Sequence, residues 1–287
     1  MARTLEPYQL VERSIITKYR KVLWNPFIEA VKRYEMIQPG DRIAVCISGG
    51  KDSMLLAKLM QQLPKHSDFP FELVFLVMDP GYNELNRQKI ESNAALLNIP
   101  VTIFESDIFE VADSAGKSPC YLCARMRRGY LYSRAQELGC SKIALGHHFN
   151  DVVETTLISM FYGSQLQAML PKLHSTNFEG MTLIRPLYCV HEDDIIAWAR
   201  DNSLEFIQCA CRLTERSAAD TGDVNVSKRK EIKLLLRRLR QGNPNIEKSI
   251  FNSIHAVALD TMPGFKTGGV EHSFLEHFNA MESTEDE

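Results

Sequence analysis

The chain of 287 residues is long enough for one large domain or two smaller ones, and 45% hydrophobic residues suffice for a buried core. A net charge of −3 argues against a general nucleic-acid binder, and no apolar run is long enough to span a bilayer. Because the N-terminus has no apolar signal segment, we expect a cytoplasmic protein that does not contact membranes.

The first two hundred residues predict a helical lead-in followed by alternating strands and helices. Residues 1–40 are the lead-in, which ends at Pro39-Gly40. The expected strands are 42–47, 71–78, 101–106, 142–148 and 181–188, and the expected helices are 52–63, 83–98, 120–138, 150–163 and 192–202. This alternation predicts an α/β protein with a Rossmann-like, doubly wound parallel sheet and helices on both faces.

The pattern changes in the last third of the chain. Residues 227–240 and 243–259 predict two helices without a strand between them. From Gly264 onward there is little periodicity, so we expect a loose tail that ends in the acidic run 282–287. The predicted organisation is a lead-in over 1–40, a main domain over 41–212 and a C-terminal helical extension over 213–287.

The stretch SGGKDS follows the first predicted strand and opens a helix, where ligands of such sheets bind. Gly49 and Gly50 let the backbone approach an anion, and Lys51 adds a positive charge. Ser48 and Ser53 add hydroxyl donors, whereas Asp52 would repel phosphate unless it holds Mg²⁺ or caps the helix. The alternative is a tight turn with a helix cap.

SGGKDS is neither a Walker A loop nor a GxGxxG loop, but it resembles the PP-loop, SGGxDS, of the N-type ATP pyrophosphatases. That resemblance implies the fold of the adenine nucleotide alpha hydrolases and cleavage of ATP between its α and β phosphates. The segment GHHFND resembles a second nucleotide-site motif of these enzymes, which implies nucleotide binding by Gly146 and His147 and a role for Asp151 in Mg²⁺ contact or proton handling. The alternative for His147 and His148 is hydrogen bonding at a helix entry.

The cysteines divide into structural and chemical candidates. Cys46, Cys140 and Cys189 suit burial in the core. Cys120 and Cys123 follow Ser118 and Pro119, an N-cap and first-turn pair, so they would lie one turn apart near the positive end of a helix. With the distant Cys209 and Cys211, they could serve a structural zinc, a redox dithiol or a cubane iron–sulfur cluster.

Taken together, SGGKDS, PCYLCARMRRG, LGHHFND, IRPLY and the late cysteine pair resemble the tRNA 2-thiocytidine synthetase family over about residues 21–212. The resemblance implies ATP, Mg²⁺ and a 4Fe-4S cluster on Cys120, Cys123 and Cys209. Because the family usually has CxxC where this chain has CAC, Cys211 is the alternate third ligand. It also implies that ATP adenylates O2 of an anticodon-loop cytosine and sulfide attacks C2, with Lys51, Asp52 and Asp151 as the catalytic residues.

Further expectations concern partners. The basic segment 228–240, and Arg125, Arg127, Arg128 and Arg134 beside the cysteine pair, could bind tRNA phosphates or form solvated faces. We expect Phe149, Phe161 and Tyr162 to pack in the core rather than to stack on bases. A cysteine desulfurase or another sulfide donor would supply sulfur, and a homodimer is left open. The alternatives are another RNA base, desulfuration, a ligase with another nucleophile, or a zinc-stabilised nucleotide-binding protein.

Overall fold

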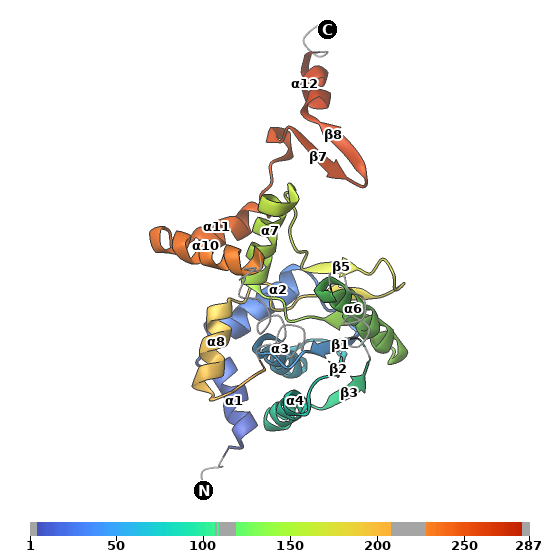
Figure 1. Ribbon diagram of the computed structural model, residues 1–287, viewed down its shortest axis with the longest axis vertical. Helices are drawn as coiled ribbons and strands as arrows, with labels where there is room; N and C mark the ends of the chain where they lie inside the picture. The colour runs from blue at the N-terminus through green and yellow to red at the C-terminus, as the bar shows by residue number, and fades with distance from the viewer. Residues whose placement is uncertain (1–4, 107, 109–118, 208–227, 283–287) are drawn as a thin grey trace. The chain divides into compact units, whose positions relative to one another are not determined.

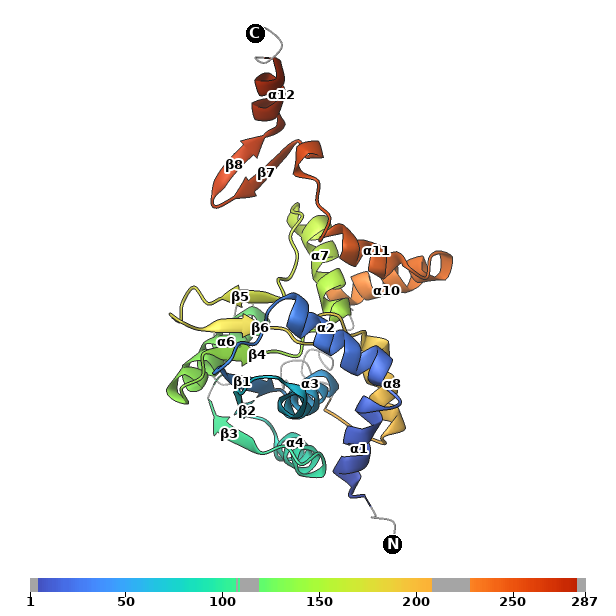
Figure 2. The ribbon, with the colours of Figure 1, turned by 180° about the vertical axis from the view of Figure 1, so that it is seen from behind.

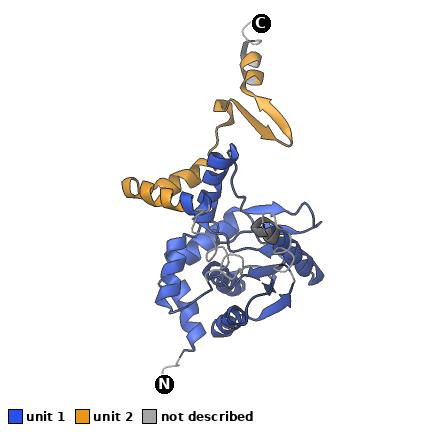
Figure 3. Ribbon diagram, in the orientation of Figure 1, with its two compact units in different colours: residues 1–232 blue, residues 233–287 orange. Residues whose placement is uncertain are grey.

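The computed structural model describes residues 5–106, 108, 119–207 and 228–282. The chain divides into two compact units, Met1–Ile232 and Lys233–Glu287 (Figure 3). The predicted domain boundaries at 40/41 and 212/213 stay predictions, since the second lies outside the described residues.

The first unit is built on a mixed, mostly parallel sheet. Among the described residues its six strands run in the order β3 (Val101–Glu105), β2 (Glu72–Asp79), β1 (Arg42–Ile47), β4 (Lys142–Ala144), β6 (Thr182–Ile184) and β5 (Lys172–His174). All neighbours pair in parallel except β5, which is antiparallel to β6 at the edge. The chain adds strands first on one side of β1 and then on the other, so the order reverses between β1 and β4. That reversal point is where doubly wound sheets bind ligands.

Helices cover both faces of this sheet, as predicted. Figures 1 and 2 place α3 (Lys51–Gln62) and α4 (Glu84–Leu96) on one side and α6 (Pro119–Glu137) on the other. On the α6 side, Tyr132 and Ala135 pack against Ala44 and Cys46 of β1. Every residue of β1 from Ile43 to Ile47 is buried, which explains why this strand is a continuous apolar run rather than an alternating one.

The predicted helical lead-in is confirmed as α1 (Pro7–Ile16), a π-helical turn (Arg20–Trp24) and α2 (Asn25–Arg33). Lys58 of α3 joins the lead-in to the core, because its fully buried Nζ lies 2.7 Å from Glu12 Oε1 and 2.8 Å from the Leu97 carbonyl oxygen. Burial lowers the pKa of Lys58 more than Glu12 raises it.

Two short strands differ from their predicted lengths, and one strand was missed. The expected strands 142–148 and 181–188 shorten to β4 and β6, because the chain leaves the sheet after Ala144 and Ile184. In the second case Pro186, which has no backbone N–H, cannot continue the hydrogen-bonded ladder. The polar segment Lys172–His174 gives no apolar pattern, yet it forms the edge strand β5.

In the second unit, α10 (Lys228–Gly242) continues from the first unit and α11 (Ile246–Ser253) follows, so the two predicted helices are confirmed. The predicted loose tail after Gly264 is wrong. Residues Gly264–Thr267 and Val270–Ser273 form the antiparallel strands β7 and β8, and α12 (Phe274–Glu282) follows. The physical reason is the turn between the strands, Gly268-Gly269, in which both residues have positive φ, as two-residue hairpins require.

No helix within the described ranges combines the length and the apolar character needed to cross a bilayer.

Candidate active site

The predicted phosphate loop is a closed turn between β1 and α3. Ser53 Oγ accepts hydrogen bonds from the Ser48 backbone N–H (3.1 Å) and the Ser48 hydroxyl (3.2 Å), and it donates to the Gly50 carbonyl oxygen (2.9 Å). Gly49 has φ +85°, which disfavours any residue with a side chain. No side chain of the N-cap residue, Gly50, covers the start of α3. The turn therefore presents a helix N-terminus that suits an anion.

The β4–α7 loop packs directly on this turn, where α7 is Phe149–Gly163. A Cβ on Gly146 would lie 3.1 Å from the backbone carbon of Asp52 and 3.1 Å from the backbone nitrogen of Ser53. These neighbours are backbone atoms at the start of a helix and cannot move aside cheaply. The structure thus brings together the two motifs that the sequence assigned to the nucleotide.

Gly146→Ala is therefore expected to displace the β4–α7 loop from α3, at a cost of about 1–3 kcal/mol in the free energy of unfolding. The variant should also bind ATP more weakly. Thermal unfolding and titration with an ATP analogue measure the two effects. Gly129→Ala lies inside α6, where the added Cβ meets no other part of the described chain within 4 Å, and it is the matched control: it should keep its ATP affinity and lose no stability, because alanine favours a helix over glycine. Equal behaviour of the two variants would contradict the tight approach.

Lys51 is held by carboxylates from two helices. Its Nζ lies 3.1 Å from Asp52 Oδ1 and 3.0 Å from Glu192 Oε1, the first residue of α8 (Glu192–Asp201). Burial alone would lower the pKa of Lys51, but Asp52 and Glu192 outweigh it and raise that pKa above its usual range. Lys51 is therefore a fixed positive charge at the loop.

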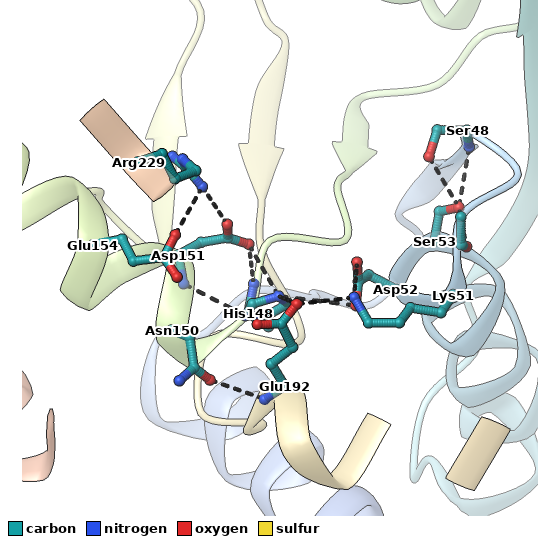
Figure 4. A network of polar contacts seen from close by, with 11 residues as sticks. Ser48, Lys51, Asp52, Ser53, His148, Asn150, Asp151, Glu154, Glu192 and Arg229 are labelled. Carbon is teal, nitrogen blue, oxygen red and sulfur yellow. Dashed lines mark hydrogen bonds and ion pairs between the residues drawn. The ribbon is translucent and has the colours of Figure 1, made fainter. Parts of the chain in front are cut away.

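His148 lies among these carboxylates (Figure 4). It is the N-cap of α7: its backbone N–H donates to Asp151 Oδ2 (3.0 Å), and its Nδ1 accepts from the Asp151 backbone N–H (3.4 Å). The helix-entry role considered for His148 is thus confirmed. Its Nε2 lies 3.6 Å from Asp151 Oδ2, 3.9 Å from Asp52 Oδ1 and 4.0 Å from Glu192 Oε1, and the side chain is only 4% exposed.

Asp151 is kept ionised by its surroundings. Burial would raise its pKa, but His148, His147 and Arg229 together lower it. Arg229, in the first turn of α10, places Nη1 2.6 Å from Asp151 Oδ1 and 3.4 Å from Glu154 Oε2. Asp151 is a partly buried, charged carboxylate that shares the neighbour His148 with Asp52, and it therefore suits a role toward a metal ion.

His147, in contrast to the ionised Asp151, is uncharged. Burial, aided by the positive charge of Arg185, lowers the pKa of His147 to about 4, so its imidazole is neutral at physiological pH. Its Nδ1 is buried and accepts or donates no hydrogen bond among the described residues. Burial and the nearby Arg128 likewise lower the pKa of Arg185 to about 10. A neutral imidazole can pair with an uncharged group of a ligand.

A contact chain joins the cysteine-bearing helix to the loop. Arg127 of α6 donates from Nη2 to the Tyr82 hydroxyl (3.3 Å), and that hydroxyl donates to the Ser48 carbonyl oxygen (3.5 Å). The helix begins at Pro119, so Cys120 and Cys123 lie in its first two turns, as predicted. Their side chains, together with Cys209 and Cys211, lie outside the described residues.

The structural cysteines fit their predicted role. Cys46 and Cys140 are buried, and Cys189 is half-buried. Burial raises the pKa of both Cys46 and Cys189 to about 12, which keeps these thiols protonated.

The prediction of core packing holds for one of the three aromatic residues. Phe149 is 4% exposed, but Phe161 and Tyr162 at the end of α7 are 53% and 38% exposed, so that prediction is wrong for these two. Both lie in the last turn of α7. Lys228 Nζ lies 4.8 Å from the Tyr162 ring centroid.

Sequence reasoning missed Glu192, Arg229 and Tyr82 as members of the site. Glu192 had a signal, because EDD begins a few residues after the predicted fifth strand and so lies at the same sheet edge as SGGKDS. The sequence places Arg229 only in the basic segment 228–240, and no sequence motif indicates Tyr82. Asp52 is in the first turn of α3 and pairs with Lys51 instead of acting as the N-cap residue.

In the described part of the chain, no group of three or more His, Cys, Asp and Glu side chains has the geometry of a complete metal site. A magnesium ion bound with ATP needs fewer protein ligands, since phosphates and water fill most of its coordination shell. Asp52 Oδ1 is shielded from solvent and accepts no hydrogen bond among the described residues, although Lys51 lies beside it. Asp52 and Asp151 are therefore chemically suited to such an ion.

The reversed parallel sheet with SGGKDS and GHHFND at its switch point defines a PP-loop protein, and residues 17–214 match the PP-loop domain family. The chain belongs to that family and, within it, to the tRNA-cytidine(32) 2-sulfurtransferase family. The tRNA-cytidine(32) 2-sulfurtransferase of Geobacter sulfurreducens is 37% identical over 240 residues, which cover 83% of this chain and 90% of the relative. The one of Neisseria meningitidis serogroup C is 41% identical over 198 residues, 67% of this chain and 61% of the relative.

A solved structure shares the fold. It is the U34-tRNA thiolase NcsA from Methanococcus maripaludis with its 4Fe-4S cluster, with a TM-score of 0.63 and 19% sequence identity, over 85% of this chain and 80% of that one. The fold class expected from the sequence is confirmed.

Proposed function

We propose that this protein is an ATP-dependent tRNA thiolase that converts cytidine 32 of the anticodon loop to 2-thiocytidine. The relatives named for this reaction, which match most of the chain, support the substrate. The observation that carries the proposal is the packing of Gly146 on Asp52 and Ser53, which joins both nucleotide motifs in one site. Because its substrate is tRNA, we place the enzyme in the cytoplasm.

In this proposal the loop residues bind the triphosphate of ATP. The backbone amides at the start of α3 and the Lys51 ammonium face the β and γ phosphates, which leave together as pyrophosphate. Asp52 and Asp151 would hold Mg²⁺, which supplies positive charge against the leaving group. The neutral His147 offers a hydrogen-bond partner to the adenosine or to the cytosine.

The reaction has two balanced steps. Cytosine O2 forms a bond to the α phosphorus as the bond from that phosphorus to the pyrophosphate oxygen breaks. Sulfide then forms a bond to C2, and the C2–O2 bond breaks, so AMP leaves with the cytosine oxygen. The adenylate is a far better leaving group than the original carbonyl oxygen, which is why ATP is consumed.

The cysteines of α6 fit an iron–sulfur cluster. Cys120 and Cys123 lie in the first two turns of a helix, where thiolates are favoured, and Arg127 on the same helix reaches Tyr82 at the phosphate loop. With Cys209 they would hold a 4Fe-4S cluster, which leaves one iron open to carry sulfide when bound. A cysteine desulfurase or another sulfide donor would deliver the sulfur, and a homodimer is compatible with this scheme.

The proposal predicts two linked results in solution. Anaerobically purified protein should contain iron and acid-labile sulfide rather than zinc, and AMP should form from ATP only when tRNA is present. tRNA from cells that lack the gene should contain no 2-thiocytidine by nucleoside mass spectrometry. Normal 2-thiocytidine in those cells, with no second enzyme of this kind, would refute the proposed substrate.

We propose that exposed arginines of α10 contact tRNA phosphates. Arg237 and Arg238 are exposed, whereas Arg240 pairs with Glu247 at 2.5 Å and is not free for RNA. Arg237→Gln/Arg238→Gln should weaken tRNA binding and lower the slope of log K against log salt by about 1–2. Lys32→Gln/Arg33→Gln, an exposed pair at the end of α2, removes the same charge and should leave tRNA affinity unchanged. Equal losses for both pairs would contradict a specific contact.

A further inference from the structure

Glu192 forms an ion pair with Lys51, the lysine that the proposed function assigns to the phosphates of ATP. Its Oε1 lies 3.0 Å from Lys51 Nζ, and the two side chains are only 21% and 26% exposed. An ammonium group has three donors, and two of them are directed at Asp52 and Glu192. A phosphate that takes more than the remaining donor must replace one of these carboxylates, and the negative charge of each carboxylate competes with the phosphate for the lysine.

Of the two, Glu192 is the one that is held from outside the loop. Asp52 is the next residue in sequence and moves with Lys51, whereas Glu192 is the first residue of α8. Its backbone N–H donates to Asn150 Oδ1 (2.9 Å), which fixes the start of α8 to the start of α7 (Figure 4). The Glu192 carboxylate thus reaches across from an independent element to the phosphate loop.

His148 offers a second position for this carboxylate. Its Nδ1 accepts a hydrogen bond from the Asp151 backbone, so the proton of a neutral imidazole is on Nε2. That Nε2–H is directed among the acidic side chains and lies 4.0 Å from Glu192 Oε1, beyond hydrogen-bond length. A small rotation of the Glu192 side chain away from Lys51 would close this gap.

We propose that Glu192 is a positioning residue that competes with phosphate for Lys51. Without ATP, Glu192 is ion-paired with Lys51. When ATP binds, its polyphosphate replaces the Glu192 carboxylate at Lys51, and that carboxylate rotates to accept a hydrogen bond from His148. The ion pair forms again as pyrophosphate leaves. A polyphosphate carries more charge than one carboxylate and therefore wins the exchange. The cost is a lower affinity for ATP, and the gain is easier release of pyrophosphate. This inference rests on the proposed function, because it presumes that ATP binds at SGGKDS.

The test is calorimetric titration of the full-length protein without tRNA. The probes are α,β-methylene-ATP, which cannot be cleaved between its α and β phosphates, and inorganic pyrophosphate, each with Mg²⁺. Glu192→Gln should bind both about fivefold more tightly than the unaltered chain, since one partly exposed ion pair no longer has to be broken. Asp193→Asn removes the same charge from the adjacent, exposed position and should change neither affinity.

A double-mutant cycle makes the test specific to the ion pair. In a Lys51→Gln background, Glu192→Gln should no longer tighten binding. If Glu192→Gln weakens binding, leaves it unchanged, or tightens it equally without Lys51, the competition is refuted. If Glu192→Gln does not fold, Glu192→Asp, whose shorter side chain cannot span the same distance, should shift affinity in the same direction. Failure of the unaltered protein to bind the analogue at all would instead refute the proposed function.

Discussion

Lys51→Gln is expected to lower kcat/KM for ATP in tRNA thiolation about 10²–10³-fold, the usual cost of removing one group that stabilises developing charge. Lys51 lies at the start of α3, and its pKa is raised by Asp52 and Glu192, so the ammonium is charged at any pH at which the enzyme works. The substitution keeps the length and polarity of the side chain but removes the charge that would meet the leaving pyrophosphate.

The measurement is the rate of AMP release in the presence of tRNA, at saturating and limiting ATP. Lys18→Gln is the control, since Lys18 is an exposed lysine of the lead-in that pairs with Asp201 at the end of α8 and should be dispensable for catalysis. A rise in KM with kcat unchanged would assign Lys51 to ATP binding only. Full activity of Lys51→Gln would contradict the assignment of SGGKDS as the site of pyrophosphate departure.

Cys123→Ser is expected to abolish thiolation, with a loss of at least about 10³-fold, because a cluster that lacks one of three protein thiolates is not retained. The visible absorption of the cluster, the iron content and the labile sulfide should fall together. Binding of α,β-methylene-ATP should persist, since the phosphate loop is built by other residues.

Two comparisons sharpen this prediction. Cys189→Ser is the control, because burial raises the pKa of the Cys189 thiol to about 12 and leaves it unable to act as a thiolate. Cys209→Ser should lose the cluster and Cys211→Ser should keep it. The reverse pattern would make Cys211 the third ligand, and retention of iron by Cys123→Ser would refute a cluster on α6.

The sequence predicted the parts of the fold that depend on local pattern. β1 is a continuous apolar run that is buried on both faces, and SGGKDS lies between it and a buried helix, so strand, loop and helix were all placed correctly. β5 could not be predicted in the same way, because its three residues gain strand structure only by pairing with β6. The hairpin of β7 and β8 had a local signal, Gly268-Gly269, that was overlooked.

Some residues of the candidate site lie in sequence motifs, and others enter it only through the fold. Asp52 and Asp151 belong to contiguous motifs at predicted strand ends, and the resemblance to PP-loop enzymes implies a role for each; that role stays a prediction. Glu192 and Arg229 enter the site from α8 and α10, and only the three-dimensional arrangement shows that each pairs with a motif residue. Hydrogen bonding at a helix entry was one of two interpretations of His148, but its place among the acidic side chains depends on three separate helices.

The central claim is that one site couples cleavage of ATP to thiolation of a tRNA cytosine. The most direct measurement incubates the anaerobically reconstituted protein with unmodified tRNA, ATP, Mg²⁺ and sulfide, and then quantifies nucleosides and nucleotides by mass spectrometry. We predict 2-thiocytidine at position 32, formed in equal amount with AMP and absent without ATP. AMP release without 2-thiocytidine, or 2-thiocytidine that forms without ATP, would contradict it.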